Sequence, residues 1–350
     1  MIELLPALGK TEKGDGATVT EPAHRFEGDY WTRAEWREMP DTARRVRLAL
    51  GVEPIAVLPH LMPAVALPPA PKPLPLGPQP GTCLLADIAD TQPIPHEALV
   101  LALRGIDLMT GTLWGFQHGG WHLLTPETVR QRPTYQALTL AWELLELPGS
   151  SLAELAAVAA HALRATHTLA ERLGAAVTRE EAPVEAARRA ASLVLLKARF
   201  ARSVELRLLA PGTPFPSRRA WRAAYGLGFG WGHLDLLHWP AAPQRALFTL
   251  TSAGKPSYFL PERAAEGEGI PGLILSFELP SCPAPLETFD AMALALAHFR
   301  EQLGGHPTDE GGRELDLERL DAERESVAAA VTQLEAAGIT PGSREALELF

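Results

Sequence analysis

The residues whose spacing most suggests chemistry are a glycine-rich run and two pairs of histidines. The run "GLGFGWG" (226–232) spaces four glycines as a phosphate-binding loop would. A phosphate loop follows a strand and opens a helix, whereas this run follows a helical pattern and precedes a strand pattern. His161 and His167 lie six residues apart on a predicted helix, and His233 and His238 lie five apart on a predicted strand. Each spacing sends the two histidine side chains to opposite sides of the helix or strand, so we predict no metal site. The reversed order of helix and strand around the glycine run likewise predicts no nucleotide site.

No other group of residues makes a catalytic set. The two cysteines, Cys83 and Cys282, are too far apart in sequence to suggest a zinc cluster, and their low number fits a reducing compartment. Asp309 and Glu310 are interpreted as a solvated turn. No serine or cysteine has the strand–turn–helix setting of a nucleophile elbow. The sequence therefore predicts a protein that is not an enzyme, with no catalytic residue, metal ion or cofactor.

Composition narrows the class of partner. The chain has 350 residues, 46% apolar and 21% charged, which is enough for two ordinary domains. Its net charge is −10, with a pI near 5.6. Binding to nucleic acid or to anionic lipid needs clustered lysine and arginine, so neither is expected.

Residues 1–81 form two segments in this interpretation. Residues 1–53 are an N-terminal arm with a short helix, in which Tyr30, Trp31 and Trp36 either pack back on the domains, dock a partner or stay disordered. Residues 54–81 are a proline-rich linker; its prolines are Pro54, Pro59, Pro63, Pro68, Pro69, Pro71, Pro73, Pro75, Pro78 and Pro80. Because proline breaks helices, this apolar stretch is not a membrane helix, and no direct membrane insertion is expected.

The rest of the chain contains one unit twice. Residues 83–118 align with residues 204–239 at a constant offset of 121, matching prolines and glycines. A fixed offset between these residues indicates shared turns and helix ends. We predict a divergent repeat 1 at 82–200, repeat 2 at 202–338 and a C-terminal tail at 339–350.

Each repeat shows the element order β-α-β-β-β-α-α. Repeat 2 begins with the strand "VELRLLA", and "GHLDLLHW" (232–239), "ALFTLT" and "GLILSF" follow its first helix. Ser151 and Glu154 form a capping box before the first long helix of repeat 1. This order predicts an α+β fold of two tandem units, each an antiparallel sheet with helices on one face and the other face open.

Repeat 2 resembles the C-terminal FtsZ-binding domain of the cell-division protein ZipA. The resemblance rests on five motifs in order: "GFGWGHLDLLHW", "ALFTLTSAGKPSYF", "IPGLILSFELP", "FDAMALALAHFREQLGG" and "TDEGGREL". It implies a shallow groove on the open sheet face that takes the FtsZ C-terminal tail as an amphipathic helix. It implies a peptide-binding face made by Glu205, Arg207, Leu234, Leu236, Thr251, Ala253, Lys255, Ile274 and Ser276.

Two positions depart from the family pattern. Ser276 replaces a large aromatic residue and Ala253 replaces a methionine, so tail binding by repeat 2 is expected to be weaker than the family's. Repeat 1 offers a less charged alternative face at Leu84, Ala86, Leu113, Thr139 and Ala141. That face either binds a tail or packs on repeat 2.

The function expected from the sequence is that of a cytoplasmic cell-division adaptor, recruited to the septum, whose partner is the FtsZ tail or a similar apolar helical peptide. One alternative is a single-stranded nucleic-acid binder, because sheets covered by helices on one face often bind RNA. Another is a pseudo-dimeric scaffold with a partner other than FtsZ.

Overall fold

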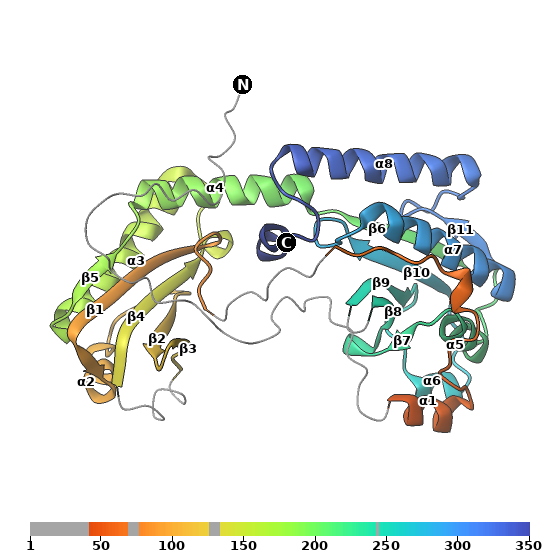
Figure 1. Cartoon of the computed structure of the whole chain (residues 1–350), viewed down its shortest axis with the longest axis horizontal. Coiled ribbons are helices and arrows are strands. Elements are labelled where there is room, and N and C mark those ends of the chain that lie inside the picture. The colour runs from red at the N-terminus through yellow and green to blue at the C-terminus, as the bar shows by residue number, and fades with distance from the viewer. Residues whose placement is uncertain (1–41, 69–76, 126–133, 243–244) are drawn as a thin grey trace. The chain divides into compact units, whose positions relative to one another are not determined.

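The computed structural model describes residues 42–68, 77–125, 134–242 and 245–350. They divide into two compact units, unit 1 within residues 72–199 and unit 2 from residues 42–68 and 200–348. Each unit has its own antiparallel sheet with packed helices (Figure 1), which confirms the predicted α+β class. Tyr30, Trp31 and Trp36 lie outside the described residues, as does the middle of the proline-rich region. None of the described helices combines the length and apolar character needed to cross a membrane.

Unit 1 has a five-stranded sheet of order β3-β2-β4-β1-β5. Its elements are β1 (Cys83–Pro95), α2 (His96–Ala102), β2 (Thr112–Gln117), β3 (Gly120–Leu123), β4 (Thr134–Glu143), α3 (Leu152–Leu173), β5 (Ala176–Arg179) and α4 (Pro183–Phe200). Helix α3 begins where predicted: the Ser151 hydroxyl accepts a hydrogen bond from the Glu154 amide at 3.2 Å. It ends at Gly174, whose φ of 67° suits glycine.

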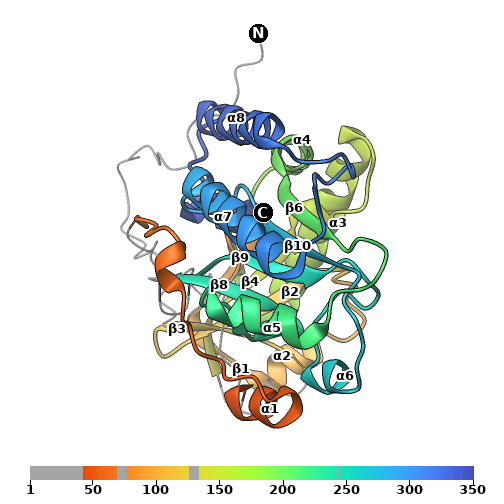
Figure 2. The same cartoon turned by 90° about the vertical axis from the view of Figure 1, so that its right-hand side faces the viewer.

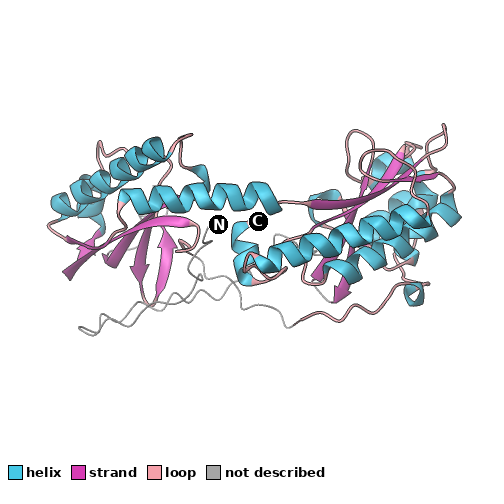
Figure 3. Cartoon of the chain, turned by 90° about the horizontal axis from the view of Figure 1, so that it is seen from above, coloured by secondary structure: helices cyan, strands magenta, loops and turns pink. Residues whose placement is uncertain are grey.

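The core of unit 1 lies between its sheet and its helices (Figure 3). Alternate residues of the two central strands supply it, and each is at most 1% exposed: Leu84, Ala86 and Ile88 of β1 and Leu138, Leu140 and Trp142 of β4. These residues stand directly opposite one another across the β1–β4 ladder, so they share one face.

Unit 2 has a six-stranded sheet of order β11-β6-β10-β9-β8-β7. Its elements are α1 (Thr42–Leu50), β6 (Ser203–Leu209), α5 (Ser217–Gly226), β7 (Gly230–Trp231), β8 (Leu237–Ala242), β9 (Arg245–Ser252), α6 (Pro261–Ala265), β10 (Gly272–Glu278), α7 (Pro285–Leu303), β11 (His306–Thr308), α8 (Leu317–Ala336) and α9 (Arg344–Leu349), with 3-10 turns at Pro59–Leu61 and His233–Asp235. Helices α5 and α7 lie on the same side of this sheet, and α8 packs on α7 (Figure 2).

Aromatic rings fill the core of unit 2. Trp221 of α5 packs edge-on against Phe259, with ring centroids 5.8 Å apart, and Phe229 packs edge-on against Phe248 of β9 at 5.5 Å. Phe299 of α7 also packs against Phe229, with ring centroids 5.8 Å apart. Edge-to-face pairs of this kind add to the free energy of burial and fix the helices on the sheet.

The two units share a frame but differ in one hairpin. In both, the first strand pairs with the strand before the long helix, as β1 with β4 and β6 with β10. In both, a short strand between the long helices, absent from the predicted order, pairs with the other edge of the first strand, as β5 and β11 do. The hairpins β2–β3 of unit 1 and β8–β9 of unit 2 differ in the strand that pairs with the rest of the sheet. In unit 1 it is the first strand of the hairpin, β2, which pairs with β4; in unit 2 it is the second, β9, which pairs with β10.

Candidate functional site

Three neighbouring strands of unit 2 present one helix-free face. The register places Glu205 opposite Ser276, and Arg207 and Thr251 on either side of Ile274. Adjacent residues of β6 point the other way: Val204, Leu206 and Leu208 are at most 6% exposed and face the helices. We call this helix-free surface the unit 2 open face; its residues, all half-buried, are Glu205, Arg207, Thr249, Thr251, Ile274 and Ser276.

The unit 2 open face is mainly polar. The Arg207 guanidinium donates two hydrogen bonds to one carboxylate oxygen of Glu205, at 3.0 Å and 2.5 Å. The hydroxyls of Thr249 and Ser276 lie 3.2 Å apart and hydrogen-bond across the β9–β10 pair. Ile274 is the one aliphatic residue of the six and lies between Arg207 and Thr251. The face therefore offers one small apolar contact flanked by charged and hydroxyl groups.

Two further predicted residues continue this face past the end of β9. Ala253 is exposed, and its amide donates to the Gly272 carbonyl at 2.9 Å, which holds it beside the start of β10. Lys255 is also exposed and borders a cavity of about 300 Å³ between the end of β9 and α6. Trp221 and Arg263 also line this cavity, and no residue of the unit 2 open face does.

The prediction of a single strand over 232–239 is wrong. Residues 233–235 form a 3-10 turn in which Leu234 has φ 59°, and β8 starts only at Leu237. Leu234 is 68% exposed on this turn, so it is not a member of the sheet face. Leu236 is half-buried and directly precedes β8. The structure thus brings the predicted residues of β6, β9 and β10 together and leaves Leu234 apart from them.

Sequence reasoning missed two neighbours on the same side. They are Thr249 of β9 and His238 of β8. Thr249 stands opposite Ser276 on β10 and opposite His238, so both residues lie beside the predicted ones. Their signal was the alternation of β8 and β9, in which Leu237, Trp239, Phe248 and Leu250 point to the core.

The single face predicted for repeat 1 is wrong, because its residues lie on both sides of the sheet. Leu84, Ala86 and Leu113 lie on the helix-covered side, at most 5% exposed, with Leu113 opposite Leu140. Thr139 and Ala141 lie on the other side. We call this other side the unit 1 second face; its residues are Cys83, Leu85, Asp87, Thr112, Trp114, Thr139 and Ala141.

The unit 1 second face is apolar at one end and largely buried. Cys83, Leu85 and Ala141 form a cluster in which each is at most 7% exposed, with Trp114 packed against it. At the other end Asp87 accepts a hydrogen bond from the Thr139 hydroxyl at 2.7 Å and pairs with Arg179 at 2.8 Å. This face therefore serves as a second small core.

Cys83 has none of the properties of a reactive thiol. Burial and the nearby Glu143 carboxylate raise the pKa of Cys83 to about 12, so the thiolate is not formed near neutral pH. Cys282 is also buried, and its Sγ lies 3.2 Å from the Thr288 hydroxyl. Across the described segments, no group of three or more histidine, cysteine, aspartate or glutamate residues is placed to hold a metal ion.

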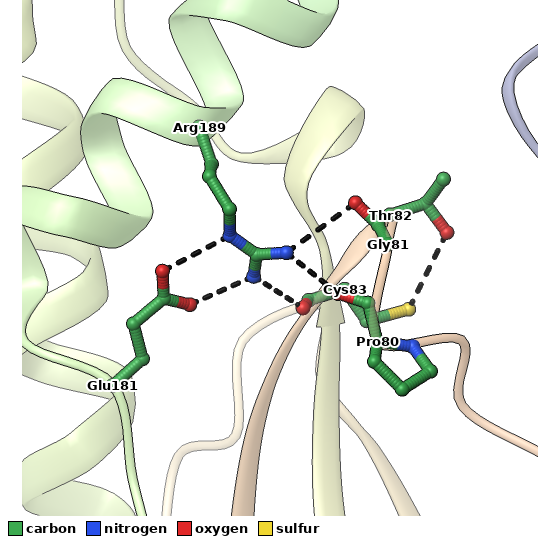
Figure 4. Close-up of polar contacts among 6 residues, drawn as sticks. All are labelled: Pro80, Gly81, Thr82, Cys83, Glu181 and Arg189. Carbon is green, nitrogen blue, oxygen red and sulfur yellow. Dashed lines mark hydrogen bonds and ion pairs between the residues drawn. The ribbon is translucent and has the colours of Figure 1, made fainter. Parts of the chain in front are cut away.

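A half-buried arginine network anchors the first strand of unit 1 (Figure 4). Arg189 of α4 donates to both carboxylate oxygens of Glu181, at 3.0 Å and 2.7 Å. Its guanidinium also donates to the carbonyls of Pro80, at 2.6 Å, and Cys83, at 2.8 Å. In unit 2 the corresponding tie is weaker, because Arg202 donates to Ser326 of α8 at 3.0 Å and 3.3 Å. These contacts position strands and involve no reacting group.

Comparison with known families assigns unit 2. Residues 203–326, from β6 into α8, match the model of the family described as ZipA, C-terminal FtsZ-binding domain. This is a family of non-catalytic binding domains, and the match confirms the resemblance seen in the sequence. A search of curated proteins gave no match to this chain. Unit 2 therefore contains a domain of the ZipA C-terminal FtsZ-binding family, spanning residues 203–326.

Proposed function

We propose that this chain is a non-catalytic cell-division adaptor that binds the C-terminal tail of FtsZ on the unit 2 open face. The observation that carries the proposal is the location of this face: it lies within the residues that match the family, on the side of the sheet opposite α5 and α7 (Figure 2). Six half-buried side chains from three adjacent strands keep part of their surface accessible there.

The chemistry of the face defines the peptide that would fit. A helical tail needs a small number of apolar anchors, which supply most of the affinity. Ile274 offers one such contact, whereas Ser276 and Ala253 offer little apolar area. The Glu205–Arg207 pair adds groups that fix the orientation of charged residues on the peptide. We therefore expect weak binding, because each missing anchor forfeits about 1–3 kcal/mol of buried apolar area.

Accessibility favours unit 2 over unit 1 as the binding unit. Leu85, Thr139 and Ala141 of the unit 1 second face are at most 7% exposed, so a peptide would have to displace existing packing. On the unit 2 open face every residue retains part of its exposure. A peptide can reach Ile274 without disturbing the core.

The test is a titration of a labelled FtsZ C-terminal tail peptide with the whole chain, followed by fluorescence anisotropy. We expect saturable binding that Ile274→Glu reduces at least tenfold, because a carboxylate in an apolar contact is not solvated. Leu317→Glu is the matched control: this residue is 82% exposed at the start of α8, and the variant is expected to bind as wild type. Absence of binding by the wild-type chain, together with diffuse distribution of a tagged copy in dividing cells, would contradict the division role.

A parallel titration with a single-stranded oligonucleotide separates the alternative. The net charge of −10 and the absence of an aromatic residue among the six on the unit 2 open face predict no saturable binding at physiological salt. Oligonucleotide binding that Ile274→Glu abolishes would assign the face to nucleic acid instead.

A further inference from the structure

A segment outside the family match packs on the helical side of unit 2. This segment, called the strap here, consists of residues 42–62: helix α1, an extended stretch and the 3-10 turn at Pro59–Leu61. Unit 1 separates it from the rest of unit 2 in the sequence, yet α1 packs against α6 (Figure 1). Part of the region predicted as linker is therefore in contact with unit 2.

Arg45 makes side-chain polar contacts from the strap to unit 2. Its guanidinium donates to both carboxylate oxygens of Glu262 on α6, at 2.9 Å and 3.0 Å. The same guanidinium lies 4.7 Å from the ring centroid of Trp231, within the range of a cation–π contact. The hydrogen bonds from Arg45 lower the pKa of Glu262, so this carboxylate is charged at neutral pH.

Apolar and main-chain contacts extend this interaction along the strap. Val46, Leu50 and Val52 are at most 3% exposed. The Leu58 amide donates to the carbonyl of Gly226 at the end of α5, at 2.8 Å. The extended stretch runs close over this helix end, because a Cβ added at Gly226 would lie 3.8 Å from Val57.

We propose that Trp231, Glu262 and the end of α5 form a second peptide-docking site of unit 2, whose ligand is the strap of the same chain. The ligand class is a short helix whose arginine pairs with Glu262 and lies over Trp231, followed by an extended apolar stretch that donates a main-chain hydrogen bond. The site lies on the helical side of the sheet, separate from the unit 2 open face. Its occupant is continuous with the chain, so the local concentration of the strap keeps the site filled.

A second arginine on α1 provides an internal control. Arg47 lies two residues from Arg45 and pairs with Glu53, at 2.8 Å, within the strap itself. Both arginines are exposed, and both make ion pairs with glutamate. Only the Arg45 pair crosses from the strap to the site, so only Arg45 is expected to matter for docking.

The first measurement uses hydrogen exchange on the full chain. The Leu58 amide reports docking, because its acceptor belongs to α5 and not to the strap. We expect Arg45→Ala to accelerate exchange of this amide about tenfold, from the loss of one ion pair and one cation–π contact. Arg47→Ala is expected to leave the rate unchanged. Equal rates in the two variants, or an unprotected Leu58 amide in the wild type, would overturn the proposal.

The second measurement adds a labelled synthetic peptide of residues 42–62. The wild-type chain, with its site filled, is expected to bind this peptide weakly. The Arg45→Ala, Val46→Asp chain has a vacated site and is expected to bind it more than tenfold tighter; adding Glu262→Gln reduces this binding, whereas adding Ile274→Glu does not. A peptide that binds all four chains alike, or none of them, contradicts the proposal.

Discussion

The two units use the faces of their sheets differently. In unit 1 helices cover one face, and on the second face Cys83, Leu85 and Ala141 form a buried cluster beside the exposed Thr112. In unit 2 one face is packed with aromatic and aliphatic residues, while the other keeps charged and hydroxyl groups partly exposed. The same frame of first strand, central partner and long helices thus supports a unit with a buried apolar cluster on its second face and a unit whose second face is polar and partly exposed.

The difference predicts losses of stability of different size for substitutions at two adjacent residues of β2. Leu113 is on the helix-covered face, so Leu113→Glu buries an unpaired carboxylate and is expected to lower the free energy of unfolding by about 3–5 kcal/mol. Trp114→Glu removes part of an apolar contact on the unit 1 second face and is expected to cost about 1–1.5 kcal/mol. Chemical denaturation followed by circular dichroism measures both. Equal losses would show that the face assignment is wrong.

The arginine hydrogen bonds that hold the first strand of each unit predict a second, smaller difference in stability. Arg189→Met leaves Glu181 and the carbonyls of Pro80 and Cys83 without their donor, and we expect a loss of about 2–3 kcal/mol in unit 1. Arg202→Met in unit 2 is expected to cost about 1 kcal/mol, because it breaks contacts to Ser326 alone.

Arg188→Ala is the control for the tie in unit 1. Its exposed pair with Glu185 contributes less than about 0.5 kcal/mol. A loss at Arg189 no larger than that at Arg188 would exclude a structural role for the network in Figure 4.

How far the sequence could place these faces depends on its alternation. "VELRLLA" alternates apolar with charged residues, so the pattern predicts for Glu205 and Arg207 the side of the sheet that the structure shows. "CLLADIA" has apolar residues on both sides, because Cys83 and Leu85 belong to the second cluster, and its pattern does not distinguish one face from the other. For this reason the pattern assigns Leu84 and Ala86 to the wrong side.

The turn at Leu234 and the contacts of the strap could not be predicted from the sequence for a different reason. Leu234 belongs to an apparent strand pattern that the positive φ at this residue interrupts, and single-sequence periodicity contains no signal for that turn. The strap reaches unit 2 across more than a hundred intervening residues, through contacts such as the ion pair between Arg45 and Glu262 and the hydrogen bond from Leu58 to Gly226. Such long-range contacts depend on the folded arrangement of α1 and α6 rather than on local pattern.

A buried histidine on α7 predicts that the thermal stability of the protein depends modestly on pH. Burial lowers the pKa of His298 on α7, so the folded state favours neutral histidine, while the nearby Glu301 opposes this shift. The unfolded state then binds the proton more readily, and the contribution of His298 is complete above pH 6.5 and is lost as pH falls through the folded pKa. We expect the Tm of wild type to fall between pH 7.5 and pH 5.5, and to fall less in His298→Gln.

His161 on α3 is the matched control, because its side chain is exposed and lies 3.9 Å from Asp107. His161→Gln is expected to keep the wild-type change in Tm. If the Tm of His298→Gln changed with pH as much as that of wild type, the burial of His298 would not be the cause of the pH dependence.

The most direct test of the account compares the two faces in one binding experiment. Whole-chain wild type, Ile274→Glu and Trp114→Glu are titrated into the same labelled FtsZ tail peptide, and circular dichroism checks that each is folded. The account predicts at least tenfold weaker binding for Ile274→Glu and wild-type binding for Trp114→Glu. Loss of binding in Trp114→Glu with full binding in Ile274→Glu would contradict it, because the tail would then occupy unit 1.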